Sequence, residues 1–310
     1  SREIIKSVAP TNPLLSLARR LPNMSRSQRS MPVMSALATA YFVTGDTGLK
    51  QTTELNWENK YVHAEELAAI VPIPEAVLDD SAYDIWGEVK PSLEEAFGVA
   101  IVGAVLYGTN IPANWTTDLG CAGLLAGSTA AAQTVDLSVQ VAAGDDLYDV
   151  LLGESGVISL IEADGFMHTG HLAHMTMRGK LRGLREKVWD GTAASPLGPP
   201  IFTRSMQDAS RYELDGSPIY FPTDGSIDGT ASLLVTGDWN QLVYSMRQDI
   251  SYKILDQAVI QDAAGNIIYN LAQQDMVALR AVMRLGFALP NPIKRMNTNA
   301  ATRYPFSVLV

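Results

Sequence analysis

The chain has 310 residues, of which 47% are hydrophobic and 18% are charged, and its formal net charge at pH 7 is −10. This composition is typical of a globular protein and excludes a disordered chain. No apolar run reaches the ~18 to 20 residues that cross a bilayer, so no membrane span is expected. The first residues lack the pattern of a signal peptide, and Cys121 is the only cysteine. We therefore expect a soluble protein of cytoplasmic origin without an intrachain disulfide.

The charge is distributed unevenly along the chain. Residues 1–35 hold six basic residues and one acidic residue, a net charge of +5, so the remainder carries −15. Free nucleic acid is a poor partner for this acidic body, because phosphates are neutralised by Lys and Arg. The basic segment is expected to lie on an acidic neighbour, since residues 45–98 contain twelve Asp and Glu. Contact of this segment with nucleic acid is the alternative.

The N-terminal third predicts two protruding segments. Residues 1–40 contain four prolines and one short helical candidate at 14–20, which predicts an extended arm. Residues 45–63 predict a thin hairpin, followed by a return strand at 65–74, and its few large apolar residues are Leu55, Trp57, Tyr61 and Val62. An isolated two-stranded hairpin is marginally stable in water. We interpret it as a segment held by a partner outside its own subunit, which favours an assembly protein over an enzyme.

A long helix is predicted over residues 81–107, after a helical turn at 75–78. Ser81 offers an N-cap with Asp84 three residues later, and Pro91 is expected to bend the helix. Apolar residues recur at helical spacing: Ile85, Trp86, Val89, Leu93, Phe97 and Ala100.

The rest of the chain mixes helix and strand patterns. Residues 109–145 are small and predict a crossing between two lobes. Helices are then expected at 146–163 and 171–184, with a short strand at 165–167 between them. Later strand and turn signals lie at 218–222, 232–235, 242–244 and 264–266, before a long apolar segment at 276–289. The sequence therefore predicts an α+β fold in two lobes with two protruding arms.

Three histidines are the best candidate for chemistry. His168, His171 and His174 stand three residues apart, and the predicted helix would place His171 and His174 on one face, as in a zinc site. The favoured alternative is a set of cap and surface histidines, because zinc needs a further ligand and second-shell acceptors. Cys121 lies among small apolar residues and is expected to be a buried, inert thiol. No nucleophile or phosphate-loop motif is present, so no cofactor and no catalysis are expected.

Four stretches taken in order carry a resemblance to a known family. They are the hairpin at residues 45–63 with its return strand, residues 71–80 leading into the long helix, residues 164–168, and residues 284–292. Together they resemble the major capsid protein of tailed bacteriophages, with the Hong Kong 97 type of fold. The resemblance covers nearly the whole chain and lies in the order and spacing of these segments.

The resemblance implies a division of the chain into named parts. These are an N-terminal arm (1–40), an extended loop (41–72), a peripheral domain (73–140) with a spine helix (81–107), an axial domain (141–245), return strands of the peripheral domain (246–292), and a C-terminal segment that returns to the axial domain (293–310).

It also implies that the loop and the arm contact neighbouring copies of the chain. The residues expected in these intersubunit contacts are Lys50, Leu55, Trp57, Lys60 and Tyr61 of the loop and Arg19, Arg20, Arg26 and Arg29 of the arm. Each pair of exposed charges contributes only ~0 to 1 kcal/mol. Such pairs would therefore fix how neighbouring copies align more than how tightly they bind.

Some members of this fold join a loop lysine to an asparagine of a neighbour, with a glutamate as the base. Here the matching positions are Lys60 or Asn59 for the lysine, Asp275 near the asparagine, and Val282 for the glutamate. Amide formation lacks a group to take the amine proton when the base is absent. The sequence therefore predicts a shell without covalent cross-links.

The expected function is structural, with hexamers and pentamers of the chain forming an icosahedral shell around weakly contacted double-stranded DNA. Portal, scaffold or decoration proteins are possible further partners, and the protein is expected in the virion after assembly in the host cytoplasm. An encapsulin-like compartment with protein cargo is the alternative within this fold. A metal-dependent hydrolase using His168, His171 and His174 is the rival of another class.

Overall fold

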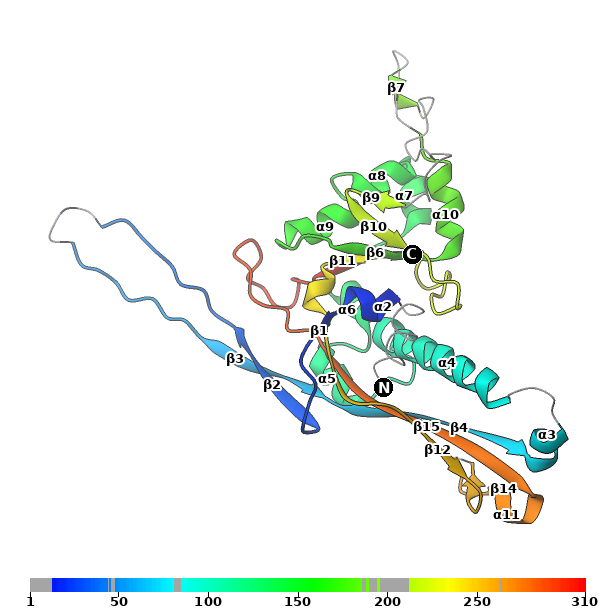
Figure 1. Cartoon of the computed structure of the whole chain (residues 1–310). Coiled ribbons are helices and arrows are strands. Elements are labelled where there is room, and N and C mark those ends of the chain that lie inside the picture. The colour runs from blue at the N-terminus through cyan, green and yellow to red at the C-terminus, as the bar shows by residue number, and fades with distance from the viewer. Residues whose placement is uncertain are drawn as a thin grey trace.

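The computed structural model describes residues 13–43, 45, 48–80, 85–185, 188–189, 194–195, 212–262 and 264–310. Residues 1–12 of the predicted arm, and the predicted N-cap at Ser81 and Asp84, lie outside the described residues. Figure 1 shows two bodies joined in the middle, one built on a six-stranded sheet and one on a long four-stranded sheet, with a thin ribbon that projects to one side.

The four-stranded sheet has the order β1-β12-β15-β4. Its strands are β1 (Arg19–Arg20), β12 (Val243–Leu255), β15 (Met276–Ala288) and β4 (Glu65–Pro74). β15 pairs antiparallel with both β12 and β4. Alternate residues of β15 point into the main core, as period-two geometry requires, and these are Leu279, Ala281, Met283, Leu285 and Phe287.

Helix α4 (Ile85–Tyr107) lies along this sheet (Figure 1), so the predicted spine helix is confirmed over its described part. Its buried residues include Leu93, Phe97, Ile101 and Val105, which are four residues apart and therefore share one helix face. Pro91 lies inside the helix. The helix ends before Gly108, whose φ of 71° suits glycine.

The six-stranded sheet has the order β5-β16-β11-β6-β10-β9. Its strands are β5 (Thr134–Val135), β16 (Phe306–Leu309), β11 (Leu234–Gly237), β6 (Gly170–Ala173), β10 (Ser217–Tyr220) and β9 (Glu213–Leu214). Every residue of β6, β11 and β16 is buried. Strand β16 pairs with β11 and β5, so the C-terminal segment completes this sheet. The neighbouring helices are α6 (Leu124–Ala130), α7 (Leu137–Ala143), α8 (Leu147–Leu152), α9 (Val157–Ala163) and α10 (Met175–Arg182).

The segment expected to cross between the lobes, at residues 109–145, contains three helices: α5 (Ala113–Leu119), α6 and α7. Two predictions for the residues that follow are wrong. The expected helix at 146–163 is divided into α8 and α9, because Gly153 adopts an extended conformation with ψ of 175°. Residues 165–167 form no strand, and the strand begins instead at Gly170, where the sequence predicts a turn and a helix. Burial between two neighbouring strands overrides the local helical pattern there.

The predicted arm is also corrected by the structure. Helix α2 (Pro13–Leu17) is shorter than expected, and Arg19 and Arg20 form a parallel strand beside Val243 and Tyr244. Leu14 is fully buried in the main core. Residues 13–24 are therefore packed on their own subunit, because Leu14, Ala18 and Met24 are buried in its core clusters.

The remaining elements are short. A small hairpin of β13 (Val259–Gln261) and β14 (Ile267–Asn270) contains the predicted turn. The others are α3 (Glu75–Asp80), α11 (Leu271–Gln274), the 3-10 helix η1 (Trp239–Gln241), and the short pair β7 (Val188–Trp189) and β8 (Ala194–Ser195).

Candidate intersubunit surface

The projecting ribbon is built from two strands that lie far apart in the sequence. β2 (Gln28–Met34) pairs antiparallel with β3 (Trp57–His63), from Gln28 opposite His63 to Met34 opposite Trp57. The predicted hairpin within residues 45–63 is therefore wrong, and the predicted return strand, β4, belongs to the four-stranded sheet. We call residues 27–64 the loop ribbon, with its root at residues 27–28 and 62–64 and its tip at residues 35–56.

The root is fixed to the body by close packing. Val62 is fully buried and lies in a small cluster with Met24, Val243 and Ala288. Gly286 of β15 faces the root so closely that a Cβ at this position would overlap the carbonyl oxygen of His63. Glycine is therefore required by the approach of two backbones rather than by a turn.

Helix α5 adds a polar anchor to the same root. The Trp115 indole Nε1–H donates to the His63 carbonyl oxygen at 3.0 Å, and the His63 backbone N–H donates to Asp118 Oδ2 at 2.8 Å. The His63 ring Nδ1 also lies 2.9 Å from the Asp118 carboxylate. Burial raises the pKa of Asp118, and its hydrogen bonds to His63 act in the opposite direction. These bonds offset the cost of burying the carboxylate.

The tip has far fewer internal bonds. The backbone N–H of Ser35 donates to the Asn56 carbonyl oxygen at 2.9 Å, the Thr39 N–H to Thr53 Oγ1 at 3.0 Å, and the Tyr41 hydroxyl to the Gln51 carbonyl oxygen at 2.9 Å. One guanidinium, that of Arg295, reaches the tip and donates to the Ala38 carbonyl oxygen at 2.7 Å. A segment held by so few contacts has low local stability.

Large apolar side chains are exposed along the ribbon. Among the predicted contact residues, Leu55, Trp57 and Tyr61 are exposed, and Trp57 retains 62% of its accessible surface. The sequence prediction missed Phe42, which is completely exposed, and Leu49, which is 90% exposed. Leu49 stands alone among small and polar residues, which is a signal in the sequence, whereas Phe42 lies between Tyr41 and Val43 and reads in the sequence as part of an apolar run. Contiguous exposed apolar surface marks an interaction site.

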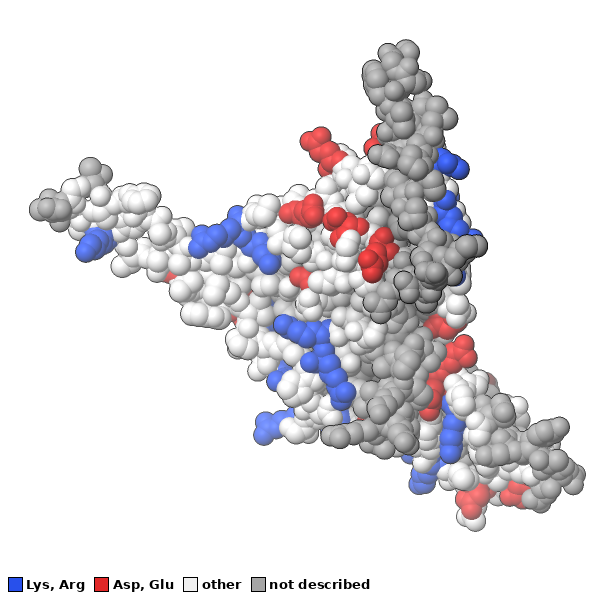
Figure 2. Space-filling model, turned by 45° about the horizontal axis from the view of Figure 1, so that its top comes forward, with Lys and Arg blue, Asp and Glu red and all other residues white. Residues whose placement is uncertain are grey.

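The predicted basic contact residues do not form one patch. The guanidinium of Arg29 donates to the Pro22 carbonyl oxygen at 2.9 Å, and that of Arg20 donates to Asn23 Oδ1 at 3.1 Å. Lys60 pairs with Glu58 at 3.2 Å. The side chains of Arg19, Arg26 and Lys50 are exposed. On the face in Figure 2, positive and negative groups occupy separate small areas, and neither sign covers the surface.

The three histidines do not meet at a metal site. His171 lies in strand β6 and is fully buried, with Nε2 3.1 Å from the Leu214 carbonyl oxygen and Nδ1 2.9 Å from Thr236 Oγ1. His174 is the N-cap of α10, and His168 Nε2 lies 3.2 Å from the Asp215 carbonyl oxygen. The predicted shared helix face is wrong, because His171 is in a strand.

Two further predictions about reactive groups can be compared with the structure. Cys121 is partly buried rather than fully buried, and burial raises the pKa of its thiol. This favours the unreactive protonated form, as expected for an inert thiol. Among the described residues, the side chains that could share a metal are Glu162, His168 and Asp215, a group without His171 or His174.

The spine helix on a long antiparallel sheet, the six-stranded body and the one-sided ribbon define the fold of tailed-phage capsid proteins. The sequence matches the phage capsid family over residues 1–297, and the chain belongs to this family. It is 24% identical to the major capsid protein of Staphylococcus phage 80alpha over 297 residues, which cover 91% of this chain and 78% of that protein.

Solved structures agree with this assignment. A chain of Microbacterium phage Oxtober96 is 33% identical, with a TM-score of 0.77 over 96% of this chain and 90% of that one. A chain of Mycobacterium phage Cain is 28% identical, with a TM-score of 0.76 over 96% and 90%. The protein is thus a structural component of a phage shell. No helix among the described residues is long and apolar enough to cross a membrane.

The buried histidine of β6 should make the subunit sensitive to acid. Burial lowers the pKa of His171 from 6.5 to about 4, so the unfolded chain takes up a proton at a higher pH than the folded chain does. The stability that neutral, buried His171 gives the folded subunit is fully present above pH 6.5. As the pH falls towards 4, the free energy of unfolding decreases by at most about 3 kcal/mol. Urea titrations of unassembled subunits at pH 7 and 4.5 give the loss of unfolding free energy between the two pH values. This loss should be smaller for His171→Gln than for the parent protein, and an equal loss in the variant and the parent would contradict the prediction.

Proposed function

We propose that copies of this chain form a closed icosahedral shell around double-stranded DNA, in which each loop ribbon lies on a neighbouring copy. The observation that carries the proposal is the contrast between the two ends of the ribbon. Val62 at the root is fully buried by its own subunit, whereas Phe42 at the tip is completely exposed. A lone two-stranded ribbon gains little from folding by itself, so its tip needs a partner surface.

A closed shell supplies that surface in every copy. The ribbon of one copy and the surface of the next copy are different parts of the sequence, so their contact is heterologous, and such contacts form rings when the rotation from copy to copy closes. Standard interfaces bury ~1,600 Å² in total. Several modest contacts per subunit become cooperative once ring closure makes the later ones effectively intramolecular.

We retain the proposed division into peripheral and axial domains, with changes at the arm and loop. Strand β16 (Phe306–Leu309) joins the six-stranded sheet, which supports a C-terminal segment that returns to the axial domain. Strands β12 and β15 support the return strands at 246–292. The extended loop is better bounded at residues 27–64, because β2 is one of its two strands.

Weak DNA contact follows from the charge of the body. The chain has 33 acidic and 23 basic residues, and this acidic excess disfavours tight binding of phosphates, so the shell would enclose packaged DNA and bind it only weakly. The protein would be assembled in the host cytoplasm and remain in the virion. Portal, scaffold or decoration proteins would be further partners of the shell.

We also propose that the shell has no covalent cross-links. Val282, at the position of the expected glutamate, is a buried aliphatic residue paired with Ala68 and Ser251 in the sheet. Lys60 pairs with Glu58 of its own ribbon. A lysine amine cannot attack an amide efficiently without a base to take its proton.

Purified particles test the function directly. Electron microscopy should show icosahedral shells, and nuclease-treated particles should release double-stranded DNA. After boiling, the protein should run on a denaturing gel as one band of 33.5 kDa. A monomer that forms no particles, or particles that hold an enzyme instead of DNA, would contradict the proposed function. A ladder of multimers would contradict the absence of cross-links.

Trp57→Ala should impair assembly more than folding. Its side chain is 62% exposed in the subunit, so the free energy of unfolding should change by at most about 0.5 kcal/mol. Loss of a tryptophan anchor typically weakens an interface by ~2 kcal/mol or more, about 30-fold per contact. Particle yield by sedimentation should fall strongly in Trp57→Ala, with partial recovery in Trp57→Phe. Equal yields for Trp57→Ala and the parent protein would show that Trp57 is not part of the contact.

A further inference from the structure

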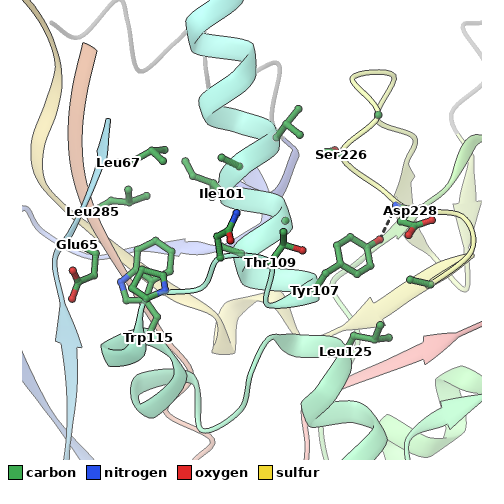
Figure 3. A pocket seen from close by; sticks show the side chains of 18 of the residues that line it. Glu65, Leu67, Ile101, Tyr107, Thr109, Trp115, Leu125, Ser226, Asp228 and Leu285 are labelled. Atoms are coloured by element: carbon green, nitrogen blue, oxygen red, sulfur yellow. Dashed lines mark hydrogen bonds between the residues drawn. The ribbon is translucent and has the colours of Figure 1, made fainter. Parts of the chain in front are cut away.

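A pocket of about 640 Å³ opens where helix α4 ends beside strand β4 (Figure 3). Its size falls within the ~300 to 1,000 Å³ of typical ligand pockets. The pocket is surrounded by residues of β4, α4, α5, α6 and β15, of the segment at 109–112 and of the loop at 225–231. The labelled side chains in Figure 3 are Glu65, Leu67, Ile101, Tyr107, Thr109, Trp115, Leu125, Ser226, Asp228 and Leu285. We call this the helix-end pocket.

The inner wall of the helix-end pocket is apolar and firmly packed. Ile101, Trp115 and Leu285 are at most 4% exposed and belong to the main core. The Tyr107 hydroxyl is fixed by Ser232 Oγ at 2.7 Å and by the backbone N–H of Asp228, which donates to it at 3.0 Å. The wall is therefore already formed before a partner arrives, which lowers the entropic cost of binding.

The rim of the pocket carries negative charge. Glu65 and Asp228 lie at its edge, and hydrogen bonds from Thr230 lower the pKa of Asp228. Glu66, the third acidic residue of the lining, is paired with Arg284. A partner that presents apolar side chains and a cation in the same short region fits both the wall and the rim, and the bond between Tyr41 and Gln51 brings the two sides of the ribbon tip together in this way.

The tip of the loop ribbon has this combination. Phe42 is completely exposed, Leu49 is 90% exposed, and the exposed Lys50 follows Leu49 directly. Figure 1 shows that the ribbon projects away from both bodies of its own chain, so this tip and the pocket of the same chain lie far apart. Only a second copy can bring them together.

We propose that the helix-end pocket receives the apolar tip of the loop ribbon of a neighbouring copy, with Phe42 as the anchoring side chain and Lys50 at the acidic rim. Aromatic residues that fill a pocket at the centre of a contact contribute most to binding. This inference rests on the proposed shell and adds the identity of the two surfaces that meet in it.

A photo-reactive benzoylphenylalanine in place of Phe42 tests the contact in assembled particles. Irradiation should give cross-linked dimers and higher multimers on a denaturing gel, and mass spectrometry should map the second site to the pocket lining, which is residues 65–67, 99–115, 125, 225–231 or 285. A cross-link only to other residues of the body, to residues 1–12, or to a different protein would overturn the proposal, as would the absence of any cross-link. Icosahedral particles in the same sample would show that the proposed function stands in that case.

Filling the pocket provides a second test with a matched control. Ala100 and Ala96 are both exposed on α4, one turn apart, but only Ala100 lines the pocket. Ala100→Trp should lower particle yield at least tenfold and leave thermal unfolding of the subunit unchanged, whereas Ala96→Trp should assemble as the parent protein does. Normal assembly of Ala100→Trp, or an equal loss in both variants, would overturn the proposal.

Discussion

The close approach of the ribbon root to strand β15 is the constraint on which the remaining structure depends. Gly286 leaves room for the backbone of His63, and Trp115 and Asp118 then hold that backbone by hydrogen bonds of 3.0 and 2.8 Å. A ribbon fixed so firmly at one end leaves its subunit in one direction. This direction determines which neighbour the tip can reach, and an assembly with uniform geometry needs it to be the same in every copy.

The firmly held root and the sparsely bonded tip have different tasks: the root sets the direction of the ribbon, and the tip stays free to bind a neighbouring copy. The tip keeps its apolar side chains exposed because it projects away from the core of its own subunit (Figure 1), and its few hydrogen bonds join only the two sides of the ribbon. The subunit body, in turn, leaves an apolar pocket open beside Trp115, on the helix that also anchors the root. Helix α5 thus contacts both surfaces of the proposed contact. It anchors the root of its own subunit's ribbon, and it lines the pocket that would receive the ribbon of a neighbouring copy.

The sequence predicted elements whose pattern is local and missed those that depend on distant partners. Helix α4 could be predicted because its apolar residues repeat at helical spacing. Strand β2 could not, because it contains Pro32 and its partner lies beyond a tip of more than twenty residues. His171 was assigned to a helix because a four-residue strand buried on both sides has no alternation. Leu55, Trp57 and Tyr61 were found as exposed residues, but the exposure of Phe42 needed the structure.

Hydrogen–deuterium exchange on free subunits and on assembled shells tests the central claim most directly: the subunit holds the root, and a neighbour orders the tip. The amide of His63, bonded to Asp118, and that of Ala64, bonded to Ser27 at 2.8 Å, should exchange slowly in both samples. Amides of residues 37–43 and 48–55 should exchange quickly in free subunits and slowly only in shells. Equal protection of the tip in both samples, or a root that exchanges quickly in the free subunit, would contradict the account.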